Sequence, residues 1–167
     1  EMLAEALRGE FSEITRGWID LLRLAASMHD IGKVGIADAI LLKPGAFTPE
    51  ERRLMELHPL IGADTLVHIR QRVGDDDLLN MGIQITLSHH ERWDGKGYPY
   101  GLSAEQIPLA ARIVALADMY DALTTVRPYH PARPHAEVIQ FLQIKSGTHF
   151  DPDLVPIFAQ IAKSDGT

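Results

Sequence analysis

The spacing of apolar residues along this chain predicts helices joined by short loops. Between residues 14 and 28, apolar side chains recur every three or four positions, which is the period of one helix face. Capping boxes at residues 48–51 and 103–106 indicate two further helix starts. No segment shows a convincing strand pattern, so we predict an all-α fold. The expected helices cover roughly residues 14–32, 48–58, 59–73, 75–90, 107–125, 134–146 and 152–163.

Composition indicates one globular domain. The chain has 167 residues, of which 46% are hydrophobic, and no apolar run is long enough to cross a membrane. Cysteine is absent, which excludes disulfides and thiolate metal ligands. The net charge of −7 makes binding to a nucleic acid polymer an unfavoured function. We expect a cytoplasmic protein, and because the first residue is Glu1, we expect an excerpt of a longer protein.

Histidine and aspartate side chains occur in short motifs that suit metal binding. One His-Asp pair and one His-His pair stand near predicted helix ends, a single His precedes a proline, and one Asp interrupts an apolar run. Imidazole and carboxylate together suit iron, manganese, nickel or zinc. The pattern therefore predicts a centre with more than one metal ion, at which water is activated for hydrolysis. The candidate ligands are His29, Asp30, His58, His89, His90 and Asp118.

Each of these motifs also has an ordinary structural explanation. The pair at residues 29–30 could be a hydrogen-bonded helix cap, and the pair at residues 89–90 could be partly exposed imidazoles beside a loop. We expect Asp118 to be buried, and a buried carboxylate is either bound to metal or paired, for instance with an arginine. Asp121 follows one helical turn later and could contact a substrate or support a ligand.

A glycine-rich loop and two cations are candidates for substrate contacts. The glycines of residues 94–101 allow close backbone approach, and Tyr98 could stack on a base or donate a hydrogen bond. Lys33 stands in the turn after the His-Asp pair. Arg127 could hold a phosphate in a bidentate fork. A rigid surface loop and an ordinary exposed arginine are the alternatives.

The motifs together resemble the HD-GYP family, a branch of the HD phosphohydrolase superfamily. The match runs from about residue 21 to about residue 158 in the family's order and approximate spacing. The motifs that carry it are His-Asp-Ile-Gly-Lys (29–33), Leu-Leu-Lys-Pro-Gly (41–45), His58, His-His-Glu-Arg-Trp-Asp-Gly-Lys-Gly-Tyr-Pro (89–99), Ala-Arg-Ile-Val-Ala-Leu-Ala-Asp (111–118), Asp-Ala-Leu-Thr (121–124), Arg-Pro-Tyr (127–129) and His-Phe-Asp-Pro (149–152).

The resemblance implies a compact HD-domain helical bundle with a C-terminal helical extension, formed by residues 1–167 as a single domain. It implies metal-dependent hydrolysis of cyclic di-GMP, a bacterial second messenger, to pGpG or GMP. Two or three divalent ions, iron or manganese with zinc or nickel as alternatives, would be held by the six candidate ligands, with Asp30 bridging. Lys33 and Asp30 would be catalytic. The implied substrate contacts are Lys33, Tyr98, Asp121, Arg127 and His130.

Two departures from the family pattern bear on activity. The family has a helix upstream of these motifs that carries a further metal-binding His and, in the three-metal type, a Glu. This sequence shows no counterpart, so we expect that the helix is missing from this chain or that the site is incomplete. His130 replaces the usual Lys after Arg-Pro-Tyr, which is expected to weaken a phosphate contact near neutral pH.

Three functions therefore stay open at the level of sequence. They are a cyclic di-GMP phosphodiesterase, an HD hydrolase acting on another cyclic dinucleotide or nucleotide, and a non-catalytic module that binds cyclic di-GMP or a protein. The expected partners are cyclic di-GMP, an upstream receiver or sensory domain, and a diguanylate cyclase (GGDEF) domain.

Overall fold

The computed structural model describes residues 1–126 and 131–164, and within these ranges the chain forms helices and loops without a strand. The α-helices are α1 (Met2–Ala6), α2 (Arg16–Ala25), α3 (Asp38–Leu41), α4 (Pro49–Met55), α5 (His58–Val73), α6 (Asp77–Ser88), α7 (Leu109–Thr124), α8 (His135–Ile144) and α9 (Leu154–Ser164). Single 3-10 turns are η1 (Leu7–Gly9), η2 (Ala26–Met28), η3 (Ile31–Gly35) and η4 (Ala104–Gln106). The all-α prediction is confirmed.

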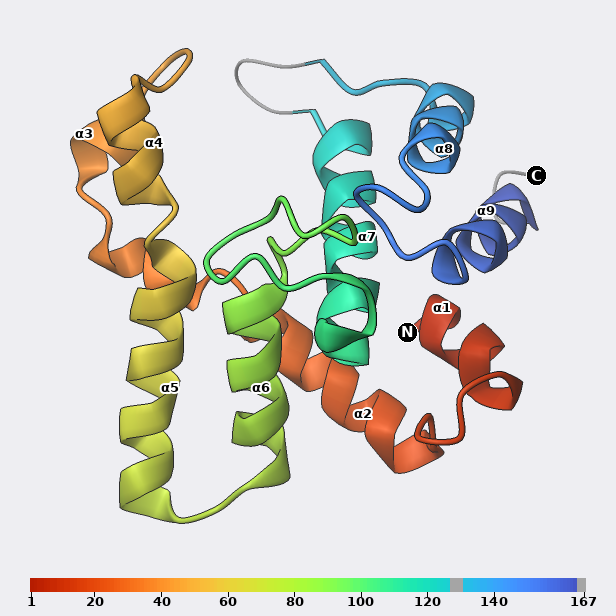
Figure 1. Cartoon of the computed structure of the whole chain (residues 1–167), viewed down its shortest axis with the longest axis horizontal. Helices are drawn as coiled ribbons and strands as arrows, with labels where there is room; N and C mark the ends of the chain where they lie inside the picture. Colours follow the sequence, from red (N-terminus) through yellow and green to blue (C-terminus); the bar gives the residue numbers. More distant parts are fainter. Residues whose placement is uncertain (127–130, 165–167) are drawn as a thin grey trace.

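Helix α7 runs through the middle of the fold (Figure 1). Helix α6 packs against it, α2 packs against α6, and α5 packs against α6 on the side away from α7. On the other side lie α8 and α9, the predicted C-terminal extension, with α1 against α9. The most deeply buried apolar side chains come from all these layers and include Leu7, Ile19, Leu66, Ile85, Leu116, Val138, Leu142 and Leu154.

A buried ion pair fastens the C-terminal extension to α7. Arg112 Nη1 donates to Asp151 Oδ2 at 2.7 Å, and both side chains are largely shielded from solvent. The same segment reaches the glycine-rich loop, because the backbone N–H of Trp93 donates to the carbonyl of His149 at 3.1 Å. The extension therefore supports the loop that follows the His-His pair.

A close backbone contact joins the turn after the His-Asp pair to the start of α5. A Cβ atom added to Gly32 would lie 1.9 Å from the carbonyl oxygen of His58 and 2.5 Å from the nitrogen of Gly62. Only glycine permits this approach, since any side chain at residue 32 would collide with backbone. The contact brings the first motif beside the first turn of α5.

Local sequence signals set several helix boundaries as predicted. Thr48 forms the expected capping box with Glu51, and the Asp76 side chain accepts a hydrogen bond from the N–H of Leu79 at the start of α6. The differences from the prediction concern where α2 ends and two short helices. Helix α2 ends at Ala25 and continues only as the 3-10 turn η2, so the His-Asp pair lies just beyond the helix.

Helix α3 falls in a segment expected to be a loop, and helix α1 was not predicted either, because four or five residues are too few to show a helical period. Its Leu3 and Ala4 are nevertheless buried in the core. Among the described residues, we find no helix with both the length and the apolar character needed to span a membrane.

Candidate metal centre

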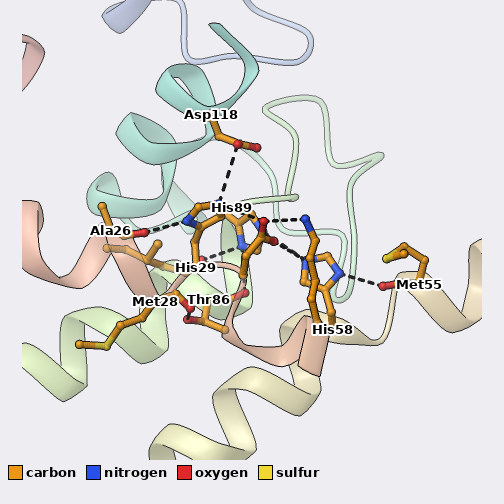
Figure 2. Close-up of polar contacts among 11 residues, drawn as sticks. Ala26, Met28, His29, Met55, His58, Thr86, His89 and Asp118 are labelled. Carbon is orange, nitrogen blue, oxygen red and sulfur yellow. Dashed lines mark hydrogen bonds and ion pairs between the residues drawn. The ribbon is translucent and has the colours of Figure 1, made fainter. Parts of the chain in front are cut away.

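Three segments that are distant in sequence bring potential metal ligands together. One ligand atom from each of Asp30, His58, His89 and His90 lies within 4.8 Å of the others. Asp30 stands between η2 and η3, His58 is the first residue of α5, and the His-His pair directly follows α6. Figure 2 shows His29, His58 and His89 gathered around one centre, with Asp118 facing them from α7.

The carboxylate of Asp30 lies in the middle of this group. Its Oδ1 is 3.4 Å from His58 Nε2 and 3.8 Å from His89 Nε2. Its Oδ2 is 3.3 Å from His29 Nε2, which in turn is 3.8 Å from Asp118 Oδ1. All six predicted ligands therefore converge, and Asp30 is the side chain that both halves of the cluster share.

Hydrogen bonds to backbone carbonyls orient three of the imidazoles. His29 Nδ1 lies 2.7 Å from the carbonyl of Ala26, and His58 Nδ1 lies 2.8 Å from that of Met55. His89 Nδ1 lies 3.0 and 3.1 Å from two carbonyls of the last turn of α6. A carbonyl can only accept, so each Nδ1 carries the proton in the neutral ring. Each Nε2 then presents its lone pair to the centre, as metal ligation requires.

The buried arrangement of His58 and His89 suits a cation. The Nε2 atoms of His58 and His89 are only 3.4 Å apart, and the two residues are 1% and 3% exposed. Two lone pairs that face each other in a buried site repel unless a proton or a metal ion lies between them. Burial lowers the pKa of His58 and lowers that of His89 to about 4, which disfavours a shared proton at neutral pH. A transition-metal ion fits this donor set.

The charges around Asp30 keep it ionised and thus able to bind metal. Burial alone would raise its pKa, but hydrogen bonds from His29, in its protonated form, and from Lys33 outweigh this effect and hold the pKa well below the usual range. The hydrogen bond to Asp30 in turn raises the pKa of His29, although burial opposes it. The site therefore pairs a firmly anionic centre with imidazoles that are mostly neutral.

Asp118 is less buried than predicted. Its side chain is 34% exposed, because it projects from α7 into the open side of the centre, past the last core residue of that helix, Leu116. Asp121 lies one turn further and is exposed, and its carboxylate accepts a hydrogen bond from the hydroxyl of Thr125 at 3.2 Å. Of the two acids, Asp118 is the one that lies near the histidines.

The predicted substrate contacts divide into described and undescribed residues. Lys33 Nζ lies 2.5 Å from Asp30 Oδ2, at the edge of the metal cluster. The Tyr98 ring stacks on that of His90 with centroids 4.7 Å apart and planes 24° apart, and burial raises the pKa of its hydroxyl. Arg127 and His130 lie outside the described residues.

Glu91 is a site residue that the sequence interpretation missed. Its side chain follows the His-His pair and is 3% exposed. The carboxylate accepts backbone N–H groups from Tyr100 at 2.7 Å and Leu102 at 3.0 Å. A Cβ atom on Gly97 would lie 2.5 Å from the Cα of Glu91, so the loop rests directly on this residue. The signal available in the sequence was the position of this charged residue, directly after the two histidines and directly before a loop with aromatic residues.

The cluster and the fold together identify the family. The HD domain family profile matches residues 9–154, which include all six candidate ligands. The chain belongs to the HD domain family. It is 46% identical to a cyclic di-GMP phosphodiesterase of Vibrio cholerae, over 89% of this chain and 30% of that protein. A cyclic di-GMP phosphodiesterase of Thermotoga maritima is 43% identical, over 85% of this chain and 37% of that protein.

Other relatives are named for a different substrate. A 3′3′-cGAMP-specific phosphodiesterase of Vibrio cholerae is 36% identical, over 84% of this chain and 26% of that protein. This HD domain therefore spans about a third of the length of the relatives it matches, or less.

A solved structure supports the same fold and branch. The HDG"Y"P protein Bd1817 of Bdellovibrio bacteriovorus superposes with a TM-score of 0.68 at 26% identity, over 96% of this chain and 49% of that one. The expected resemblance to the HD-GYP branch is confirmed by this match and by the named relatives.

Proposed function

We propose that this HD domain is a metal-dependent phosphodiesterase that hydrolyses cyclic di-GMP to pGpG or GMP. The observation that carries the proposal is the convergence of five nitrogen and carboxylate ligands around Asp30. Relatives at 43% and 46% identity bear the name of this activity, which supports the choice of substrate. Residues 1–167 would form a single HD-GYP-like domain.

The donor set suits two divalent ions that share one carboxylate. Asp30 with His58, His89 and His90 would hold one ion, and Asp30 with His29 and Asp118 would hold the other. Iron or manganese is the proposed metal, with zinc or nickel as the alternatives and a third ion in a larger site. Such ions supply, when bound, a Lewis acid for phosphate oxygens and water that is activated at neutral pH.

The chain's own residues would bind the substrate and move its protons. Lys33, whose Nζ lies 2.5 Å from Asp30 Oδ2, would pair with a phosphate oxygen and donate a proton to the leaving ribose oxygen. Asp30 is catalytic through its central place among the ligands. Further proposed substrate contacts are Tyr98, the exposed Asp121, Arg127 and His130.

Hydrolysis by anaerobically purified protein, loaded with Mn²⁺ or Fe²⁺ and given cyclic di-GMP, tests the proposal. We expect linear product from the wild type, and neither product nor full metal content from Asp30→Asn. Asp64→Asn is the matched control, since this carboxylate is 72% exposed on α5, and it should behave as wild type. A wild-type protein with bound metal that forms no linear product would refute the proposed activity.

A second candidate substrate is another cyclic dinucleotide. The 36% identical relative named for 3′3′-cGAMP favours it. Competition between the two dinucleotides in the same assay separates the alternatives, because the preferred substrate is consumed first. A protein that binds cyclic di-GMP but retains no metal would instead be a non-catalytic module.

The proposed activity also suggests where and with what the domain works. The much greater length of its relatives supports function beside further domains, for which we propose an upstream receiver or sensory domain and a GGDEF partner. A cyclic dinucleotide messenger as substrate implies the cytoplasm. Activity of the full-length protein with and without its additional domains would measure the regulatory effect.

A further inference from the structure

His90 differs from the other histidines of the cluster in how its ring is held. His29, His58 and His89 each place Nδ1 within 3.1 Å of a backbone carbonyl. Within residues 1–126 and 131–164, neither ring nitrogen of His90 has a hydrogen bond to another residue. Hydrogen bonding therefore does not set the orientation of this imidazole.

Aromatic packing takes the place of the missing hydrogen bond. The Tyr98 ring stacks on one side of His90, with centroids 4.7 Å apart. The His89 ring lies against it at 4.0 Å, and the His58 ring meets it edge-on at 5.0 Å. The N–H of Tyr98 also donates to the carbonyl of His90 at 3.2 Å. The other two rings belong to the metal cluster itself. Tyr98 is therefore the ring outside the cluster that packs on the His90 imidazole.

The loop that carries Tyr98 is anchored by a buried charge. Glu91 accepts two backbone N–H groups, from Tyr100 and Leu102, and so bridges the far side of the loop. Hydrogen bonds to an ionised acceptor are roughly twice as strong as those between neutral groups. Gly97 permits the contact between loop and Glu91 because a side chain there would overlap backbone. The ring of Tyr98 is thereby held against His90.

We propose that Tyr98 is a positioning residue that orients His90 for metal binding through the face of its ring, and that Glu91 acts through the same loop. The inference rests on the metal centre of the proposed function. The positioning role and a substrate contact would depend on different parts of the Tyr98 side chain. A substrate contact would use the hydroxyl group, whereas orientation of His90 needs only the aromatic ring.

Three substitutions separate these roles. Tyr98→Phe keeps the ring and removes the hydroxyl, whereas Tyr98→Leu removes the ring. Tyr100→Leu is the matched control, because Tyr100 stands on the same loop and is 61% exposed. The hydrogen bond from the backbone N–H of Tyr100 to Glu91 does not depend on the side chain and is kept in this variant.

The first measurement uses metal-free protein and the ring-proton resonances of His90, assigned by their loss in His90→Gln. A stacked aromatic ring shields these protons. We expect the wild-type shifts in Tyr98→Phe and Tyr100→Leu, and unshielded resonances in Tyr98→Leu. Glu91→Gln should give an intermediate result, since one charged acceptor is lost. Identical His90 shifts in Tyr98→Leu and wild type would overturn the proposal.

The second measurement is Co²⁺ affinity and the visible spectrum of the Co²⁺ form, with folding checked by circular dichroism. Loss of a group that orients a ligand costs about 10- to 100-fold in metal affinity. We expect that loss and an altered spectrum in folded Tyr98→Leu, and affinity within about twofold of wild type in Tyr98→Phe. Wild-type affinity in Tyr98→Leu would refute the positioning role. If the wild type is inactive but the variants show the expected Co²⁺ affinities, the proposed phosphodiesterase activity is refuted and the positioning role of Tyr98 is not.

Discussion

Substitution of Gly32 by alanine should disrupt both the fold and the metal centre. The new Cβ would meet the carbonyl oxygen of His58 at 1.9 Å and the nitrogen of Gly62 at 2.5 Å. Both atoms belong to the backbone of α5, so no side chain can turn away. The turn and α5 must separate by about 1.5 Å, the difference between 1.9 Å and the 3.4 Å at which ordinary contact begins.

This displacement has a cost that can be bounded. Overpacking a well-packed interior typically costs 1–3 kcal/mol, and a collision with backbone belongs at the upper end, at about 3 kcal/mol. The total free energy of unfolding of such a domain is about 5–15 kcal/mol. Because His58 is the first residue of α5, its imidazole moves with the helix. A misplacement of about 1 Å can cost roughly 100-fold in activity.

Urea denaturation and Mn²⁺ titration of the variant measure the two effects. Gly17→Ala is the control, because a Cβ at this position of α2 meets nothing within 4 Å. Alanine there should leave metal affinity unchanged and raise stability by up to about 1 kcal/mol. If Gly32→Ala unfolds at the wild-type urea concentration and binds Mn²⁺ normally, the close contact does not position the site.

Three further predictions concern charged groups. Burial lowers the pKa of His89 to about 4 from the ordinary 6.5, so metal-free protein should lose stability as pH falls through this window. His89 alone accounts for about 2 kcal/mol at pH 5, the lowered pKa values of His58 and His90 add to the loss, and the raised pKa of His29 opposes it; equal urea midpoints at pH 7 and pH 5 would contradict this. Arg112→Met should cost about 3–5 kcal/mol because it strands the buried Asp151 carboxylate, and adding Asp151→Leu should restore most of the melting temperature. Lys33→Gln should lower kcat by about 100-fold or more with metal content unchanged, whereas a fall in metal content would assign this lysine to the cluster instead.

The sequence predicted best what depends on neighbouring residues. The capping boxes at Thr48 and Ser103 both formed, because each needs only hydrogen bonds within one turn. Helices α5, α6 and α7 lie within a few residues of their predicted bounds, since their apolar periods are long enough to recognise. The five-residue α1 and the four-residue α3 had no such period and were missed.

The site was predictable as a set of residue types but not as an arrangement. The ordered motifs identified all six candidate ligands and the family. The resemblance already implied a bridging place for Asp30, but the motifs could not show that Asp118 stays 34% exposed or that Tyr98 stacks on His90. Glu91 was overlooked because its partners are backbone N–H groups, which leave no trace in side-chain patterns.

The amino-acid sequence by itself determined the helices, their caps and the ligand chemistry, because these follow from periodicity and from contacts within a few residues. Tertiary structure alone decided the distances among ligands from α5, α6, α7 and the turn after α2. Those distances depend on how closely segments pack, as at Gly32 and Gly62, where the absence of two side chains lets backbone meet backbone. Whether the His and Asp residues form one centre is therefore a property of the packed fold.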